Sequence, residues 1–175
     1  MIANEPQVMH VVVPGTFDPV TLGHVDVILR ARRLFPHVTV AVAASANKRG
    51  SGPTFSLPER VDMISEALSA EGIHDVAVKP FSGLLVDFCH EEGAGAVVKG
   101  LRAMTDFEYE LQQADLNCHL SPDIESVFVM SNPKYGYVSS SIVREIASMG
   151  SSVETLVPRN VNERLRERFG QGAQK

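Results

Sequence analysis

The sequence predicts an α/β fold in which a doubly wound parallel sheet of about five strands carries helices on both faces. Two observations lead to it: short valine-rich runs alternate along the chain with segments whose apolar residues recur at helical spacing. Such alternation forces parallel strand pairing through right-handed crossovers. A length of 175 residues fits one domain, so we expect a single domain over residues 1–175, with flexible tails at 1–8 and 170–175.

Five short, valine-rich segments are predicted to be the strands. They span about 8–13, 38–43, 75–79, 96–99 and 126–130, and their β-branched residues suit a pleated surface. In such Rossmann-like sheets, ligands bind beyond the carboxyl ends of the strands, near the point where the strand order reverses. The loops after the first, second and fourth strands are therefore where a site is expected.

Six helices are predicted, because apolar residues recur every three or four positions in the segments concerned. They span about 22–34, 57–70, 84–92, 105–120, 140–149 and 160–169. Ser56 with Glu59, and Thr105 with Glu108, have the capping-box form, in which a hydroxyl and a carboxylate satisfy free backbone amides at a helix start. These pairs predict where the second and fourth helices begin.

Charge and composition exclude several classes of protein. The 16 Lys and Arg residues against 21 Asp and Glu give a net charge of −5, which disfavours extended binding to nucleic acid. The longest apolar runs, around 11–13 and 38–44, are far shorter than the roughly 20 residues of a membrane span. The first residues lack the basic and apolar regions of a secretory signal. We therefore expect a cytoplasmic globular protein.

The two cysteines, Cys89 and Cys118, are each followed by a histidine, His90 and His119. Zinc ligands are usually spaced more widely than this, and adjacent residues on a helix point about 100° apart. Buried thiols are therefore favoured over a metal site. Two cysteines form no disulfide framework, which fits a reducing compartment.

The turn after the first strand, residues 14–24, reads Pro-Gly-Thr-Phe-Asp-Pro-Val-Thr-Leu-Gly-His. Gly15 lets the backbone approach a ligand, Thr16 offers a hydroxyl, and the helix that follows presents unpaired amides to an anion. His24 lies in the first turn of that helix and can face the same place. The alternative is a tight turn in which Thr21 caps the helix and His24 is a satisfied core histidine.

This turn closely resembles the first motif of the phosphopantetheine adenylyltransferases, nucleotidyltransferases of the histidine-x-glycine-histidine superfamily in which Thr21 stands at the position of the first histidine. Three later segments, at 99–103, 106–110 and 138–144, also resemble motifs of that family. They read Lys-Gly-Leu-Arg-Ala, Asp-Phe-Glu-Tyr-Glu and Val-Ser-Ser-Ser-Ile-Val-Arg. The four motifs keep the order and approximate spacing of the family, and the resemblance runs from about residue 9 to about residue 169.

The resemblance implies transfer of the adenylyl group of ATP to 4′-phosphopantetheine, which gives dephospho-coenzyme A and pyrophosphate in the penultimate step of coenzyme A biosynthesis. The attacking group is a phosphate monoester with a second pKa of about 6, so it is largely dianionic at neutral pH and needs no general base. Direct in-line displacement without a covalent intermediate is therefore expected, with donors aimed at the charge that develops at the α-phosphorus and on pyrophosphate.

The resemblance also assigns roles near the reacting phosphates. His24 would donate to an α-phosphate oxygen, and Thr16 would lie at the junction of the two substrates with the backbone of Phe17 nearby. Lys48 and Lys99 would hold the attacking phosphate as point charges. A solvated surface lysine is the alternative for Lys48, whereas Lys99 ends a strand at the ligand edge.

Further roles concern ATP and the pantetheine arm. Arg102 and the amides of Gly100 and Leu101 would contact the ATP phosphates, and Glu110 would contact the ribose or base. The start of the helix at 140–149 would cap itself with serine and also form an anion nest for the β- and γ-phosphates. The residues expected there and in the adenine-side loop are Tyr135, Gly136, Tyr137, Val138, Ser139, Ser140 and Ser141. Leu85 and Asn117 would contact the pantetheine arm.

The family further implies Mg²⁺ that arrives with ATP, without a dedicated protein cage, a homohexamer, and feedback inhibition by coenzyme A. No membrane or nucleic-acid partner is expected. Two rivals stay open: a nucleotidyltransferase of the same scaffold that acts on nicotinamide mononucleotide or glycerol 3-phosphate, and a non-catalytic sensor of nucleotide or coenzyme A.

Overall fold

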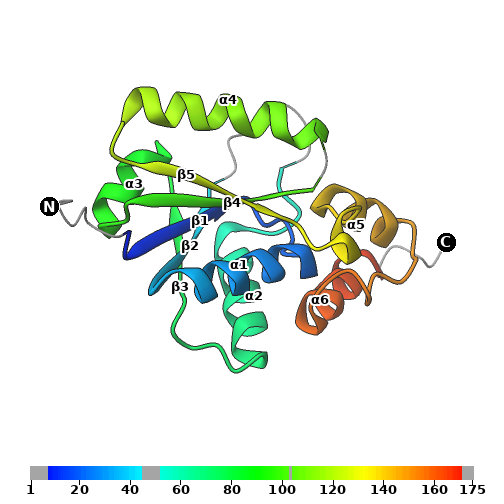
Figure 1. Ribbon diagram of the computed structural model, residues 1–175. Helices are drawn as coiled ribbons and strands as arrows, with labels where there is room; N and C mark the ends of the chain where they lie inside the picture. The colour runs from blue at the N-terminus through cyan, green and yellow to red at the C-terminus, as the bar shows by residue number, and fades with distance from the viewer. Residues whose placement is uncertain (1–7, 45–51, 103, 171–175) are drawn as a thin grey trace, which may run out of the picture.

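The computed structural model describes residues 8–44, 52–102 and 104–170, and the side chains of 104–106 are not described. Its sheet has five strands, all parallel, in the order β3-β2-β1-β4-β5 (Figure 1). The strands are β1 (His10–Gly15), β2 (His37–Ala43), β3 (Ala77–Phe81), β4 (Ala96–Leu101) and β5 (Glu125–Met130). The order reverses between β1 and β4, so the predicted doubly wound topology is confirmed.

The helices fall close to their predicted positions. They are α1 (Leu22–Leu34), α2 (Leu57–Ala70), α3 (Leu85–Glu92), α4 (Met104–Leu120), α5 (Ser140–Ser148) and α6 (Arg159–Gly170), with a short 3₁₀ turn, η1 (Pro133–Tyr135), before α5. Among the helices in the described ranges, none has both the length and the apolar character that crossing a membrane requires.

Two apolar layers cover the sheet, as alternation along each strand requires. On one face, Val11, Val13 and Val40 pack in a cluster with residues of α1, α2, α5 and α6. On the other face, Val12 and Val97 pack with Phe88 and Cys89 of α3 in a smaller cluster. The larger layer therefore includes α1 and α5, whose first turns lie at the carboxyl ends of β1 and β4.

A capping box explains where α2 begins. Ser56 caps α2, accepting from the backbone N–H of Glu59 while the Glu59 carboxylate accepts from the backbone N–H of Ser56, so this capping box is confirmed. The predicted capping pair of Thr105 with Glu108 lies outside what the structure describes, because the side chain of Thr105 is among those not described.

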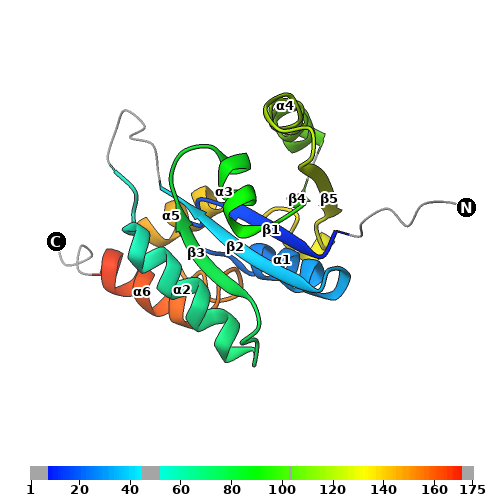
Figure 2. The ribbon, with the colours of Figure 1, turned by 90° about the vertical axis from the view of Figure 1, so that its left-hand side faces the viewer.

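The helix α4 differs from the others in how much apolar surface it leaves exposed. Figure 2 shows it end-on, standing above β4 and β5 rather than lying flat on the sheet. Four of its apolar side chains are exposed, namely Phe107, Leu111, Leu116 and Leu120. The helix therefore forms one wall of the carboxyl edge of the sheet while presenting apolar surface outward.

Candidate active site

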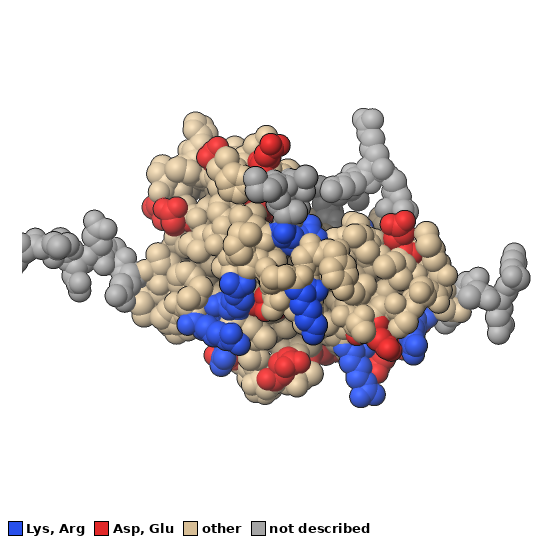
Figure 3. All heavy atoms as spheres, turned by 45° about the vertical axis from the view of Figure 1, so that its right-hand side comes forward, with Lys and Arg blue, Asp and Glu red and all other residues tan. Residues whose placement is uncertain are grey.

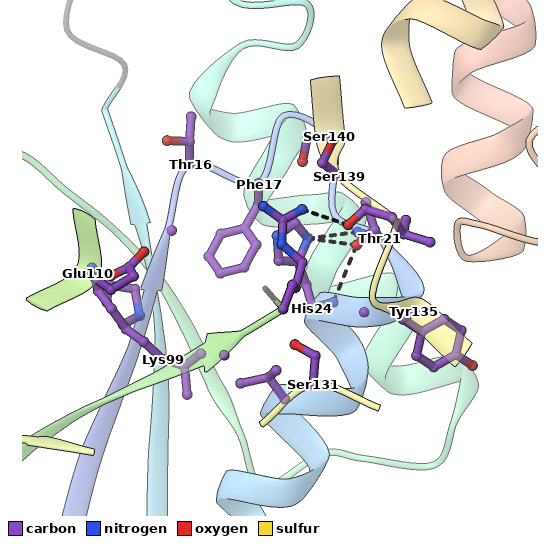
Figure 4. Close-up of a pocket in the computed structure, with 18 of the residues that line it drawn as sticks. Thr16, Phe17, Thr21, His24, Lys99, Glu110, Ser131, Tyr135, Ser139 and Ser140 are labelled. Atoms are coloured by element: carbon purple, nitrogen blue, oxygen red, sulfur yellow. Dashed lines mark hydrogen bonds and ion pairs between the residues drawn. The ribbon is translucent and has the colours of Figure 1, made fainter. Parts of the chain in front are cut away.

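A cleft of about 500 Å³ opens at the carboxyl edge of the sheet, between the ends of β1 and β4 and the first turns of α1 and α5. Most of the predicted site residues line it: Thr16, Phe17, His24, Lys99, Gly100, Arg102, Glu110, Tyr135, Val138, Ser139, Ser140 and Ser141. Figure 4 shows Thr16, Lys99 and Glu110 on one side and Thr21, Tyr135, Ser139 and Ser140 on the other, with Phe17 and His24 between them. The cleft thus has two polar sides and a central imidazole.

The turn after β1 is shaped by Phe17. Its backbone has a positive φ of 50°, a left-handed conformation that side-chain-bearing residues seldom adopt. Its ring is buried and lies so close to Gly15 that a Cβ built there would come within 2.8 Å of the ring. The ring also meets the imidazole of His24 edge-on, with centroids 5.1 Å apart. Phe17 therefore holds one flank of His24, while the neighbouring Thr16 is exposed to the cleft.

The imidazole of His24 is fixed by Thr21, the N-cap of α1. The backbone N–H of Thr21 donates to Nδ1 of His24 at 3.0 Å, and the Thr21 hydroxyl lies 3.1 Å from the same nitrogen. The hydroxyl also accepts from the backbone N–H of His24 at 3.3 Å. Because Nδ1 accepts a backbone N–H, the proton of the neutral ring is on Nε2. Thr21 therefore caps the helix, as the alternative interpretation predicted, and the same contacts orient a side chain that lines the cleft.

The protonation state of His24 follows from its surroundings. Burial, and to a smaller extent the positive charge of Arg102, lower the pKa of His24 from 6.5 to about 4. The imidazole is therefore neutral at physiological pH and offers one N–H donor, at Nε2. It is a poor proton acceptor for chemistry at neutral pH, because its Nδ1 lone pair is already engaged.

An ion pair forms the wall opposite Thr21. The ammonium of Lys99, on β4, donates to the Glu110 carboxylate of α4 at 2.6 Å, and about one fifth of each side chain is exposed. A half-buried pair of this kind is screened less than a surface pair. The cationic side chain and the carboxylate therefore reach the cleft as a unit, with Tyr109 beside them in the lining.

Arg102 and the start of α5 form the other polar side. The guanidinium of Arg102 donates to the carbonyl of Val138 at 2.8 Å. Ser139 is the N-cap of α5 and accepts from the backbone N–H of Ile142, so the predicted serine cap is confirmed. Ser140 donates to the carbonyl of Pro19 at 2.8 Å. Its hydroxyl proton is thereby engaged, and the first helical turn of α5 lines the cleft through Ser139, Ser140 and Ser141.

Two glycines allow the elements around the cleft to approach closely. A Cβ at Gly100 would come within 2.6 Å of Val27 of α1, and a Cβ at Gly23 within 3.3 Å of Tyr135. The end of β4 therefore packs against α1 because Gly100 lacks a side chain, and Gly23 lets the 3₁₀ turn η1 lie close to the first turn of α1. Their narrow spacing brings Arg102 and Tyr135 into the same cleft as His24.

Five predicted residues are not among those that line this cleft. Leu101 ends β4 with its side chain buried, Leu85 begins α3 and packs against the smaller apolar cluster, and Tyr137 is 66% exposed. Gly136 follows η1, and Asn117 lies near the end of α4. The predicted Lys48 lies outside the described residues.

Sequence reasoning missed two hydroxyl-bearing side chains of the lining, Ser131 and Tyr109. Ser131 directly follows β5, so the rule that ligands meet the carboxyl ends of parallel strands pointed to it. Tyr109 precedes Glu110 in a segment whose motif was noted, but its direction depends on how α4 stands above the sheet. A strand end is visible in a sequence, whereas the tilt of a helix is not.

The cysteines do not gather with other ligands in the described ranges. Cys89 is buried, as predicted, whereas Cys118 is exposed on α4, so the prediction of a buried thiol is wrong there. Burial raises the pKa of Cys89 to about 11, which keeps it a thiol. Within residues 8–44, 52–102 and 104–170, no three His, Cys, Asp or Glu side chains are grouped as a metal site requires.

Comparison with known proteins adds the family context. A family model described as cytidylyltransferase-like matches residues 12–146. The chain is 51% identical over 160 residues to the phosphopantetheine adenylyltransferase of Thiobacillus denitrificans, covering 89% of this chain and 97% of that protein. It is 48% identical over 157 residues to the protein of the same name from Oleidesulfovibrio alaskensis, covering 90% of this chain and 89% of that one.

A solved structure shares the fold at much lower identity. It is a bifunctional nicotinamide mononucleotide adenylyltransferase and ADP-ribose pyrophosphatase from Francisella tularensis, with a TM-score of 0.71 and 16% identity. The match covers 92% of this chain and 49% of the other, so the chain spans about half the length of that protein. Identity at this level supports the architecture alone.

Proposed function

The chain belongs to the phosphopantetheine adenylyltransferases, a family of nucleotidyltransferases, and on that premise we propose that it transfers the adenylyl group of ATP to 4′-phosphopantetheine. The products are dephospho-coenzyme A and pyrophosphate, and the reaction is a direct in-line displacement without a covalent intermediate. The observation that carries the proposal is a neutral His24 imidazole between two polar sides of one cleft. This arrangement suits the alignment of two phosphorylated substrates.

The proposed reaction needs no protein side chain to act as a general base. The attacking phosphate has a second pKa of about 6, so it reaches the cleft as a nucleophile without a general base. The low pKa of His24, about 4, agrees with this, because a base for neutral pH would need a pKa nearer 7. The protein contributes position and charge.

His24 is proposed to act as a hydrogen-bond donor. Thr21 occupies Nδ1, so Nε2–H is the donor that faces the reacting centre, where it stabilises charge that develops on an α-phosphate oxygen. A neutral donor in a partly dehydrated site is effective because it needs no reorganisation as charge develops. Thr16, exposed next to Phe17, supplies a hydroxyl at the junction of the two substrates.

The two sides of the cleft are proposed to hold different phosphates. Lys99 and Lys48 hold the phosphate of 4′-phosphopantetheine, with Lys99 leaving or sharing its pairing with Glu110. Arg102, the amides near Gly100 and the first turn of α5 hold the ATP phosphates. Helix N-termini favour anions through their free N–H groups, and α1 and α5 both begin at the cleft.

The proposed role of Glu110 toward the ribose or base follows from its pairing. Its carboxylate is balanced by Lys99 at 2.6 Å, and it can accept from sugar hydroxyls or from the adenine amino group. The adenine side is proposed to be formed by Tyr135, Gly136, Tyr137 and Val138. The backbone of Leu101 is proposed to contact the ATP phosphates, and the pantetheine arm is proposed to contact Leu85 and Asn117.

Mg²⁺ is proposed to enter with ATP. Among the described residues that line the cleft, one carries a carboxylate, Glu110, which is already paired with Lys99. This donor set fits a magnesium ion that keeps its waters and binds phosphate oxygens. When bound, the ion neutralises charge on the polyphosphate.

A homohexamer in the cytoplasm, inhibited by coenzyme A, completes the proposal. The exposed apolar side chains of α4 are of the kind that association between copies covers, and light scattering measures the assembly. Both cysteines are free thiols, which suits a reducing compartment. Coenzyme A carries the same pantetheine arm as the product, so it competes for the same cleft.

On the face drawn in Figure 3, basic side chains lie among acidic ones, which gives no support to nucleic-acid binding.

The test is incubation of the pure protein with ATP, Mg²⁺ and 4′-phosphopantetheine, followed by measurement of dephospho-coenzyme A and pyrophosphate. We expect both products in equal amounts. Nicotinamide mononucleotide and glycerol 3-phosphate in place of 4′-phosphopantetheine test the related activities of the scaffold. An inert protein that still binds coenzyme A would favour a sensor and contradict the proposal.

A further inference from the structure

Arg60 is a charged side chain in the core. It is 1% exposed and is among the largest fully buried side chains of the described chain. The helical spacing places it on the buried face of α2, in line with Met63, Ile64 and Ala67. Arginine is seldom buried unless its donors are satisfied, so the partners of this guanidinium indicate what the residue is for.

The donors of Arg60 meet three backbone carbonyls from separate segments. Nε donates to Phe55 at 3.1 Å, just before α2, and Nη1 donates to Ala43 at 2.9 Å, at the end of β2. Nη1 also donates to Thr16 at 2.6 Å, in the turn after β1. One guanidinium therefore joins the turn that bears Thr16 to the two segments that flank residues 44–54.

Asp18 strengthens the same connection from the other side. It is buried, and its carboxylate accepts from the backbone N–H groups of Thr54 and Phe55, both at 2.9 Å. Its charge favours the charged form of Arg60, opposing burial, which lowers the pKa of Arg60. The turn after β1 is thus tied to the start of α2 by both residues.

The bond to Thr16 has a geometric consequence for Phe17. The carbonyl of Thr16 and the N–H of Phe17 belong to one planar trans peptide, so they point in opposite directions. When Arg60 holds the carbonyl on the core side, the N–H of Phe17 is directed away from the core. The backbone of Phe17 is left-handed at this point, with φ 50°, and such a conformation persists only where its surroundings enforce it.

We propose that Arg60 is a positioning residue, which fixes the Thr16–Phe17 peptide from beneath and thereby orients the Thr16 side of the cleft for phosphoryl chemistry. The inference rests on the proposed function. A guanidinium suits this role because its planar fork carries several donors in fixed directions, whereas a lysine ammonium is a single flexible point charge. Arg60 itself touches no substrate in this account.

The test compares Arg60→Lys with Arg168→Lys. Arg168 is a matched control, because it donates to the Thr54 carbonyl at 2.7 Å and stacks 4.9 Å from the Phe55 ring centroid, but reaches the same segment from outside, away from Thr16. Misplacing a reacting group by about 1 Å can cost on the order of 100-fold in rate. We expect kcat per folded protein to fall by roughly 10- to 100-fold in Arg60→Lys and to change little in Arg168→Lys.

A second readout separates positioning from stability. Leu68→Ala, at a fully buried position on the same face of α2, destabilises the fold through a cavity without touching Thr16. Its kcat per folded protein should match that of the wild type, with folding measured by urea denaturation. The amide proton and nitrogen chemical shifts of Phe17, which report the orientation of the Thr16–Phe17 peptide, should change more in Arg60→Lys than in Leu68→Ala.

Several outcomes would overturn the inference. They are an Arg60→Lys protein with wild-type kcat, a Leu68→Ala protein that loses as much kcat at equal stability, or failure of both Arg60→Lys and Arg60→Met to fold, which would assign Arg60 to stability alone. Failure of the proposed function is distinguishable, because the wild-type protein itself would then form no dephospho-coenzyme A, while the change in the Phe17 amide chemical shifts would still appear in Arg60→Lys.

Discussion

The two ends of the sheet carry nearly the same polar residues and use them differently. At the amino edge, His10 contacts the Glu92 carbonyl through Nδ1 at 2.9 Å and the Thr39 hydroxyl through Nε2 at 2.8 Å, and Lys79 pairs with Glu92. At the carboxyl edge a histidine, a threonine and a lysine–glutamate pair recur, in His24, Thr21, Lys99 and Glu110.

The two histidines differ in whether a ring nitrogen can still bind a ligand. Both ring nitrogens of His10 have hydrogen-bond partners within the protein, so its role is structural. In the described part of the chain, the hydrogen bonds of the His24 ring all involve Nδ1, and the ring lines a cleft of about 500 Å³. Residue types alone therefore do not make a site. The carboxyl edge differs because it combines a cavity, helix N-termini and a histidine N–H that can donate to a ligand.

The largest effect is expected from the two histidines. His24→Ala should lower kcat by about 10²–10³, as the loss of one donor to a developing anion typically does. His10→Ala should leave kcat unchanged while lowering the free energy of unfolding by about 1–3 kcal/mol, because partners such as the buried Thr39 hydroxyl lose a hydrogen bond. Steady-state kinetics and urea denaturation measure the two. If His24→Ala and His10→Ala lowered kcat equally, the proposed difference between the two edges of the sheet would be contradicted.

The two lysines should differ next most. Lys99→Met is expected to raise KM for 4′-phosphopantetheine by roughly 10-fold or more, the size of one charge-assisted hydrogen bond. Lys79→Met, which breaks the partly exposed pair with Glu92, should leave KM unchanged, since such pairs contribute little. If Lys99→Met changes only KM for ATP, the assignment of the two sides of the cleft is reversed.

Thr21 provides a smaller test. Thr21→Val removes the hydroxyl that caps α1 and lies beside Nδ1, whereas Thr21→Ser retains it. Loss of an N-cap typically costs about 1 kcal/mol, and the backbone N–H of Thr21 still holds Nδ1, so we expect kcat to fall by a few-fold in the valine variant only. A serine variant as slow as the valine variant would show that the hydroxyl is not what matters.

The effect that is absent at neutral pH concerns the protonation of His24. The pKa of His24 is about 4 in the folded protein, against an ordinary value of 6.5 for an unfolded chain, so between those values the unfolded chain takes up a proton that the folded chain does not. This contribution to stability is complete above pH 6.5, is lost as pH falls toward about 4, and His24→Gln should remove it. Nitrogen NMR of the imidazole should show titration near 4; a midpoint near 6.5 would contradict the neutral donor.

The fold was largely predictable because its signals are local. Valine-rich runs placed the five strands to within about two residues, and β4 extends beyond its predicted end, to Leu101, because it pairs with β5 as far as Met130. The predicted start of α4, at about residue 105, lies one residue from the observed start at Met104. Exposure of Cys118 followed from the position of α4, which no local pattern encodes.

The site was predictable where it lies in one turn and not where it depends on distant packing. Thr16, Thr21 and His24 fall in a continuous segment, so their proximity was visible. The Lys99–Glu110 pair depends on how α4 stands over β4, and the three carbonyls held by Arg60 come from segments far apart in sequence. The spacing of Arg60 with Met63 and Ile64 was a signal that this charge is buried, and only the structure identifies its partners.

The central claim, a single displacement at the α-phosphorus aligned by a neutral His24, is tested most directly by stereochemistry. One diastereomer of the α-thio analogue of ATP is converted with 4′-phosphopantetheine, and the configuration at phosphorus in the thio-substituted dephospho-coenzyme A is determined by phosphorus NMR. Direct transfer predicts inversion. Retention would require two displacements through an adenylylated protein and would contradict the account.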